Sequence, residues 1–148
     1  MQMNSRRVMN VVTNPRALQV GDVVSVPYLI FFSHTGVVVG FDDLTHLPQV
    51  ASASGKHRLS ILQVWEEFSA GLPVTHRGYW STLPRWEVAR RARSLIDRPY
   101  DLFNFNCDSF VCIAHGLEPK SQQLDTAVAL TTVGLCAFAL SQMASRAA

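Results

Sequence analysis

Short runs of apolar, largely β-branched residues recur along the first half of the chain, each bounded by glycine, proline or acidic turn residues. Residues 18–26 alternate loosely between apolar and polar positions and stop at Pro27, which predicts a first strand. A buried strand is expected just after Gly36, and a turn at Asp42-Asp43 leads into a return strand. The predicted strands after the first cover residues 37–41, 45–51, 58–64 and 74–80.

The second half of the chain carries helical periodicity instead. Pro84 is placed to begin a helix that ends before Pro99, and the apolar residues on one of its faces are Val88, Ala92, Leu95 and Ile96. A second helix begins at Cys107 and stops at Gly116. Because sequential short strands precede the helices, the sequence predicts an α+β domain. In it, an antiparallel sheet from residues 21–78 packs against the helix that begins at Cys107.

The two ends of the chain differ from this central part. Residues 1–17 are predicted to be an N-terminal leader, and residues 18–120 one domain. Residues 8–12 are too short for the apolar core of a secretory signal, so we expect no export. The C-terminal segment, residues 121–148, contains a stretch that is apolar all round a helix. A membrane anchor, a core helix and an oligomer contact are its three interpretations.

Composition and charge narrow the picture further. Hydrophobic residues make up 48% and charged residues 16%, which indicates an ordered domain. Between Arg77 and Arg98, six arginines stand against one glutamate and one aspartate. This region is predicted to be either a solvated helix face or a surface that meets anionic lipid, and no nucleic acid is expected. The three cysteines form no disulfide framework, which favours a reducing compartment. We therefore expect a cytoplasmic protein, either freely diffusing or associated with a membrane.

Three residues carry candidate chemistry. Cys107 falls in the first turn of a helix, where the macrodipole and the N–H groups favour a thiolate. His34, at the entrance of the predicted buried strand, is the candidate general base. His46 would return beside His34 across a hairpin and orient it. A zinc site made of the same three residues is the weaker alternative, because no short-spaced ligand pair anchors it.

Taken together, these motifs resemble the lecithin–retinol acyltransferase-like family, which is a circularly permuted branch of the papain-like, NlpC-type cysteine enzymes. The resemblance extends from about Gly21 to beyond Gly116. Its motifs are His34-Thr-Gly-Val-Val-Val-Gly40, then His46, then Asn106-Cys107-Asp108-Ser109-Phe-Val111. The resemblance implies a permuted papain-like fold, a catalytic domain over residues 18–120 and an apolar C-terminal membrane helix. One departure is Asp108-Ser109, where family members often carry Glu-His.

The resemblance and the residues together predict thiol-dependent acyl transfer or hydrolysis through an acyl-enzyme. Lipid esters are the expected substrates, and no metal or cofactor is expected. The backbone at Cys107 would hold the oxyanion, and Tyr28 is a further candidate for that role. A cysteine peptidase or amidase of the same fold is the alternative enzyme. A binding protein that has lost catalysis is the alternative of another class.

Overall fold

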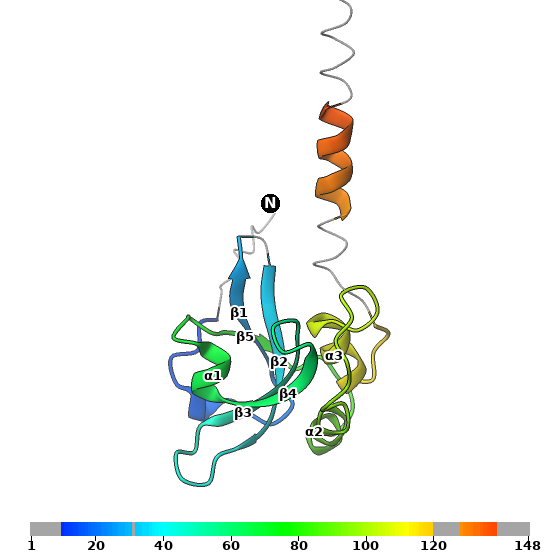
Figure 1. Cartoon of the computed structure of the whole chain (residues 1–148). Helices are drawn as coiled ribbons and strands as arrows, with labels where there is room; N and C mark the ends of the chain where they lie inside the picture. Colours follow the sequence, from blue (N-terminus) through cyan, green and yellow to red (C-terminus); the bar gives the residue numbers. More distant parts are fainter. Residues whose placement is uncertain (1–9, 31, 120–127, 139–148) are drawn as a thin grey trace, which may run out of the picture.

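The computed structural model describes residues 10–30, 32–119 and 128–138. Its centre is one antiparallel sheet in the order β4-β3-β2-β1-β5, so β2 is the middle strand (Figure 1). The strands are β1 (Val23–Leu29), β2 (Phe32–Phe41), β3 (Pro48–Ser54), β4 (Leu59–Val64) and β5 (Thr75–Gly78). The helices are α1 (Trp65–Ser69), α2 (Arg85–Ser94) and α3 (Cys107–Ala114), with a short 3-10 helix, η1 (Pro15–Ala17), before the sheet. The predicted α+β class with an antiparallel sheet is therefore confirmed.

The first strand runs past Pro27, which was predicted to end it. Within β1, Pro27 pairs with Ser33 of β2, but β5 pairs with β1 only at residues 23–25. Among the described residues, β1 beyond Ser25 therefore pairs with β2 alone. Proline lacks an N–H, and at such a position it removes no ladder hydrogen bond. The strand continues to Leu29, and the residues after it form the tip of a hairpin with β2.

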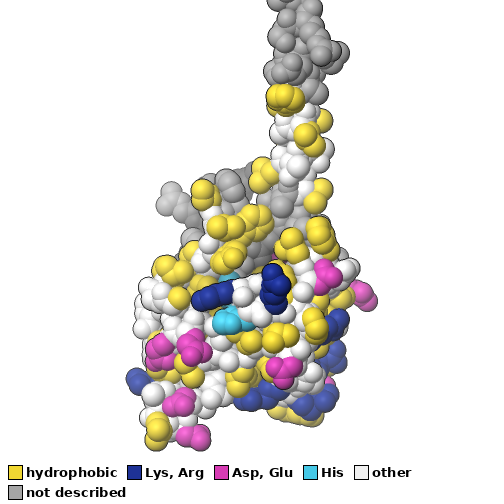
Figure 2. All heavy atoms as spheres, viewed as in Figure 1, with side chains coloured by type: hydrophobic (Ala, Val, Ile, Leu, Met, Phe, Trp, Pro, Cys, Tyr) yellow, Lys and Arg dark blue, Asp and Glu magenta, His cyan; other side chains and the backbone are white. Residues whose placement is uncertain are grey.

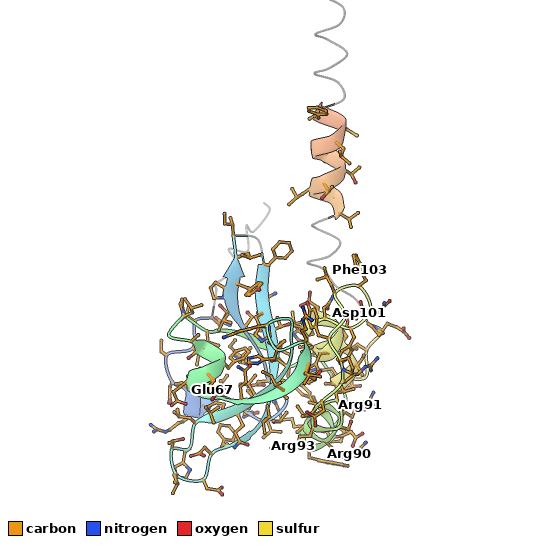
Figure 3. All side chains as sticks on the ribbon, viewed as in Figure 1. Glu67, Arg90, Arg91, Arg93, Asp101 and Phe103 are labelled. Carbon is orange, nitrogen blue, oxygen red and sulfur yellow. The ribbon has the colours of Figure 1, made fainter. Side chains whose placement is uncertain are left out.

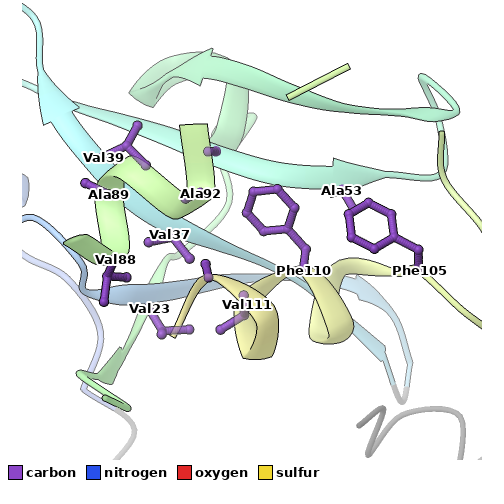
Figure 4. Packing of buried hydrophobic residues seen from close by; sticks show 12 residues of the cluster. Val23, Val37, Val39, Ala53, Val88, Ala89, Ala92, Phe105, Phe110 and Val111 are labelled. Atoms are coloured by element: carbon purple, nitrogen blue, oxygen red, sulfur yellow. The ribbon is translucent and has the colours of Figure 1, made fainter. Parts of the chain in front are cut away.

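The two faces of the sheet bury different cores. Val37 and Val39 of β2 point to the face covered by α2 and α3, where they meet Phe110 and Val111 of α3 (Figure 4). Val38, one residue out of phase, points to the opposite face, where the core includes Trp65 and Phe68 of α1. Alternation along a strand sends neighbouring side chains to opposite faces. The middle strand therefore has to be apolar on both sides, as its valine run is.

The ends of the chain partly depart from the predicted boundaries. Val12 donates its N–H to Val74 O, and His76 donates its N–H to Asn10 O, so residues 10–12 extend the β5 edge. The fold thus begins within the predicted leader, before residue 18. Residues 128–138 are helical and exposed throughout, so they do not pack into this chain's core. The rest of residues 121–148 lies outside the described part. Within residues 10–30, 32–119 and 128–138, no helix is both long and apolar enough to cross a bilayer.

Gly36 is the position in β2 where a side chain has no room. A Cβ atom there would lie 2.5 Å from Val50 Cγ1 and 3.1 Å from Phe68 Cε2. We predict that Gly36→Ala lowers the free energy of unfolding by about 1–3 kcal/mol, because packed neighbours must move apart. Urea unfolding followed by circular dichroism measures this change. Gly134→Ala is the control, since nothing lies within 4 Å of its Cβ position. Equal stability of the two variants would contradict the prediction.

Candidate active site

The start of α3 is formed by an asparagine cap. Asn106 Oδ1 accepts hydrogen bonds from the N–H groups of Asp108 and Ser109, at 3.1 Å and 3.0 Å, and from the Ser109 hydroxyl. This is the arrangement that asparagine favours at the N-cap, and it places Cys107 as the first helical residue. The two capped N–H groups are already engaged. An oxyanion held by this helix start would have to compete with Asn106 for them.

Two contacts bring the start of α3 against β2. Cys107 Sγ lies 3.9 Å from the carbonyl oxygen of Ser33, the residue before His34. On the other side of the strand, Thr35 donates its hydroxyl to Asp108 Oδ1 at 3.2 Å, and both side chains are buried. The cysteine and the histidine, 73 positions apart in the sequence, thus belong to segments that touch. Asp108, at the position where the motif departs from the resembled family, forms one of these contacts.

His34 is oriented by a serine from the neighbouring strand. His34 Nε2 lies 3.1 Å from Ser52 Oγ, and the Ser52 hydroxyl lies 3.5 Å from Gln63 Oε1 of β4. If the Ser52 hydroxyl donates to Gln63, its oxygen accepts from the Nε2–H of His34, and Nδ1 is then the basic nitrogen. The ring also packs against Phe68 of α1, with centroids 5.5 Å apart.

His46 does not lie beside His34, so the predicted orienting role is wrong. It belongs to the turn between β2 and β3, is exposed, and has a φ of 57°. His34 is near the start of β2 and this turn follows its last residue, Phe41. At about 3.3 Å per residue, seven residues of strand separate the two sites by roughly 20 Å. The sequence distance matched a hairpin, but the hairpin closes at the far end of the strand.

Burial controls the protonation of His34. Desolvation lowers the pKa of this imidazole to about 4, because the charged form loses its water. The Asp108 carboxylate acts in the opposite direction, and His57 adds to the lowering. His34 is therefore neutral at pH 7, in the form that can accept a proton.

Cys107 and His34 line one cavity of about 430 Å³. Its walls are largely apolar and come from strands β1, β2 and β3, from α1 and from the loop after α1. They include Val26, Phe32, Ala53, Phe68 and Leu72. Polar side chains line it as well, and Lys56, Gln63, Glu67 and Tyr100 are among them. Burial is the first cause of a raised Tyr100 pKa, which keeps its phenol protonated. Tyr28, the other oxyanion candidate, also lines this cavity, but 66% of its surface is exposed.

The arginine-rich region from Arg77 to Arg98 lies elsewhere. Figure 3 shows Arg90, Arg91 and Arg93 on α2, away from the loop that carries Phe103. Five of the six arginines have contacts within the chain. Arg85 binds Asp22, Arg90 binds Glu87, Arg91 and Arg93 donate to backbone carbonyls, and Arg98 lies over the Phe105 ring. These contacts favour a structural role over a surface that binds anionic lipid.

The zinc alternative loses its ligand set, because His46 lies at the other end of β2. Among the residues that the structure describes, no three His, Cys, Asp or Glu side chains are grouped to hold a metal ion.

Sequence reasoning missed Ser52 and Gln63. Ser52 is a small polar residue in a strand that is buried at all positions but Gln49, and its own exposure is 0%. A buried hydroxyl needs a partner, which makes such a position a candidate for contact with a polar site. Gln63 lies in β4, the strand at the edge of the sheet, and nothing in its sequence context indicates a role in the site.

Comparison with known proteins adds no family to this geometry: a scan against protein-family models finds no match for this chain, and a search of curated proteins finds none either. The resemblance to the lecithin–retinol acyltransferase-like family therefore stays a prediction based on the motifs around His34 and Cys107.

The lowered pKa of His34 has a consequence for stability. In the unfolded chain its pKa returns to about 6.5, so as the pH falls the unfolded state binds a proton first. The stabilising contribution is thus complete above about pH 6.5 and is lost as the pH falls toward about 4. We predict that His34→Gln reduces this acid loss by about 2–3 kcal/mol, which urea unfolding at about pH 7 and pH 4 measures.

Two histidines define the controls for this experiment. The pKa of His115 is also lowered by burial, so the variant should reduce the acid loss without abolishing it. His46→Gln, which changes an exposed histidine at the other end of β2, is the matched control. If His34→Gln and His46→Gln unfold with the same pH dependence, His34 does not have a depressed pKa.

Proposed function

We propose that this protein is a cysteine-dependent acyltransferase or hydrolase, with Cys107 as nucleophile and His34 as the group that carries the proton. One observation carries the proposal: Cys107 and His34 line the same apolar cavity, and Cys107 Sγ lies 3.9 Å from the carbonyl oxygen of the residue before His34. A lone buried cysteine is usually inert. A cysteine at a helix start that shares a cavity with an oriented histidine has the two parts that nucleophilic catalysis requires.

The reaction proceeds in two halves. As Cys107 Sγ attacks the acyl carbonyl carbon, its proton passes to His34 Nδ1, and a C–S bond forms. His34 then gives this proton to the departing alcohol or amine, whose bond to the acyl carbon breaks. In the second half, His34 takes a proton from water or from an acceptor alcohol or amine, which attacks the thioester carbon. The S–C bond then breaks, and His34 returns the proton to Cys107 Sγ. Ser52 holds the imidazole by its Nε2 throughout.

The low pKa of His34 favours a mechanism in which the thiol proton moves to His34 while the sulfur attacks the acyl carbon. A neutral imidazole can accept the thiol proton as the S–C bond forms. Asp108 favours the imidazolium that forms during this step, since its carboxylate raises the pKa of His34 against the effect of burial. The backbone at Cys107 and the Tyr28 hydroxyl are the candidates for the oxyanion, since the N–H groups of Asp108 and Ser109 donate to Asn106.

The cavity walls favour an acyl chain over a polar peptide. Valine, phenylalanine, alanine and leucine side chains line a large part of the cavity that contains Cys107, and such side chains suit an acyl chain. A lipid ester is therefore the proposed substrate class. The order of the site, with the histidine strand before the cysteine helix, is consistent with a permuted papain-like arrangement. A peptidase or amidase remains the alternative that substrate tests distinguish.

We predict a covalent acyl adduct on Cys107. The protein is mixed with short-chain phospholipids, acyl thioesters or a peptide panel, and its intact mass is measured after rapid acid quenching. A phospholipid or thioester should add the mass of its acyl group, because the thioester is an intermediate of the proposed reaction. Cys107→Ser should give no adduct. Cys136→Ser, which removes an exposed thiol on the helix over residues 128–138, should give the same adduct as the natural chain.

The outcomes separate the three functional hypotheses. If only peptides form adducts, the hypothesis of a lipid hydrolase is rejected in favour of a peptidase. No adduct with any acyl donor would support a binding protein without catalysis. Modification that persists in Cys107→Ser would assign the reaction to another residue.

A second prediction concerns the division of roles among the polar residues. His34→Asn should lower acyl release by about a hundredfold to ten-thousandfold, because proton transfer is lost. Ser52→Ala should lower it by about threefold to tenfold, since one hydrogen bond contributes about 0.5–1.5 kcal/mol. His46→Asn should retain full activity, because His46 is an exposed turn residue.

Acyl release from a chromogenic ester measures all three variants, with circular dichroism as the check on folding. If His46→Asn is inactive while folded, His46 takes part in a way that its position in the turn does not explain. If Ser52→Ala is as active as the natural chain, Ser52 does not orient the base.

A further inference from the structure

Four large apolar side chains are exposed beside the mouth of the cavity. They are Leu29 (61% exposed), Ile30 (92%), Leu102 (54%) and Phe103 (70%), and we refer to them as the apolar rim. Leu29 and Ile30 end the β1–β2 hairpin, whereas Leu102 and Phe103 belong to the loop before α3. Leu29 and Leu102 also line the cavity that contains Cys107, so two separate segments of the chain contribute apolar side chains to one mouth.

The fold does not require these residues to be apolar. None of the four belongs to either buried cluster of the sheet. The loop of Phe103 is held in place by its own polar contacts, since the Asp101 carboxylate accepts hydrogen bonds from the N–H groups of Phe103 and Asn104 and from the Asn104 side chain. An ordered loop that presents a phenylalanine to solvent indicates a surface that meets an apolar partner.

Cationic side chains stand next to this rim. Lys56, His57 and Arg58 form the exposed turn between β3 and β4, and Lys56 and His57 line the same cavity. In Figure 2, lysine or arginine and histidine side chains lie just below a group of hydrophobic ones at the upper part of the domain. Glu67 is the acidic side chain that also lines the cavity. Apolar side chains bordered by cations are the pattern by which proteins bind the interface of an anionic bilayer.

We propose that the apolar rim is the surface by which this protein lies on an anionic phospholipid membrane, with the mouth of the Cys107 cavity facing the lipid. The four side chains enter the boundary between headgroups and acyl chains, and Lys56 and Arg58 meet lipid phosphates. This orientation differs from one that uses the arginines of α2. Those side chains lie away from Phe103 in Figure 3 and are engaged by contacts within the chain.

The test is flotation of the full chain with vesicles of phosphatidylcholine alone or mixed with phosphatidylserine. The natural chain should float with the mixed vesicles and less with phosphatidylcholine alone. The double variant Ile30→Ser with Phe103→Ser should partition at least about tenfold less, because two large apolar side chains no longer enter the interface. Leu44→Ser is the matched control, since Leu44 is 91% exposed but lies in the turn at the other end of β2. It should float as the natural chain does.

The measurement needs no turnover, so its result is independent of the proposed catalysis. Cys107→Ser should float like the natural chain, even though it removes the nucleophile. If the double variant and the natural chain float equally, binding goes through another part, such as the helix over residues 128–138, and the proposal is overturned. If the natural chain does not float at all, the rim does not bind a membrane, and a protein partner becomes its explanation. Equal loss in the double variant and in Leu44→Ser would also overturn it.

Discussion

The contact between the middle strand and the start of α3 is the constraint on which the candidate site depends. Within three consecutive residues of β2, the Ser33 carbonyl meets the Cys107 thiol, His34 points to one face of the sheet, and Thr35 on the other face binds Asp108. Strand alternation makes this possible, since successive side chains leave a strand in opposite directions. The strand thus holds the base on one side and anchors the helix of the nucleophile on the other. A shift of β2 by one residue would exchange these directions and separate the two groups.

Burial of the His34 ring determines its protonation state. The apolar surroundings of the cavity also remove water from His34, which lowers its pKa and keeps it neutral. A protonated imidazole could not accept a thiol proton, whereas the neutral ring can. The apolar wall of the cavity and the neutral state of His34 therefore have one cause. The apolar rim extends this character to the surface, where the cavity opens between exposed side chains of the hairpin and of the loop before α3.

Much of the architecture was predictable from local patterns. The strand and helix sequence, the antiparallel sheet, the start of α3 at Cys107 and the candidate base His34 all follow from periodicity, turn residues and capping preferences, which act within a few residues of each other. The strand boundary at Pro27 was wrong for a reason that local pattern does not contain. Whether a proline ends a strand depends on which neighbours that strand has, and here the second neighbour of β1 has already ended.

The sequence by itself therefore determined the elements, their order and the two residues with nucleophilic and basic chemistry. Only the tertiary structure decided which side chain orients the base. His46 had a suitable residue type and spacing, but spacing along a hairpin does not say where the hairpin closes, and β2 continues for seven residues past His34. Ser52, a residue type without strong chemistry of its own, lies against the ring because β3 runs antiparallel to β2, so that beyond the last pair, Val37 and Ala51, the two strands bring His34 and Ser52 to the same end of the sheet. Register results from packing on both faces of the sheet at once, and such long-range packing is not encoded in any short stretch of the chain.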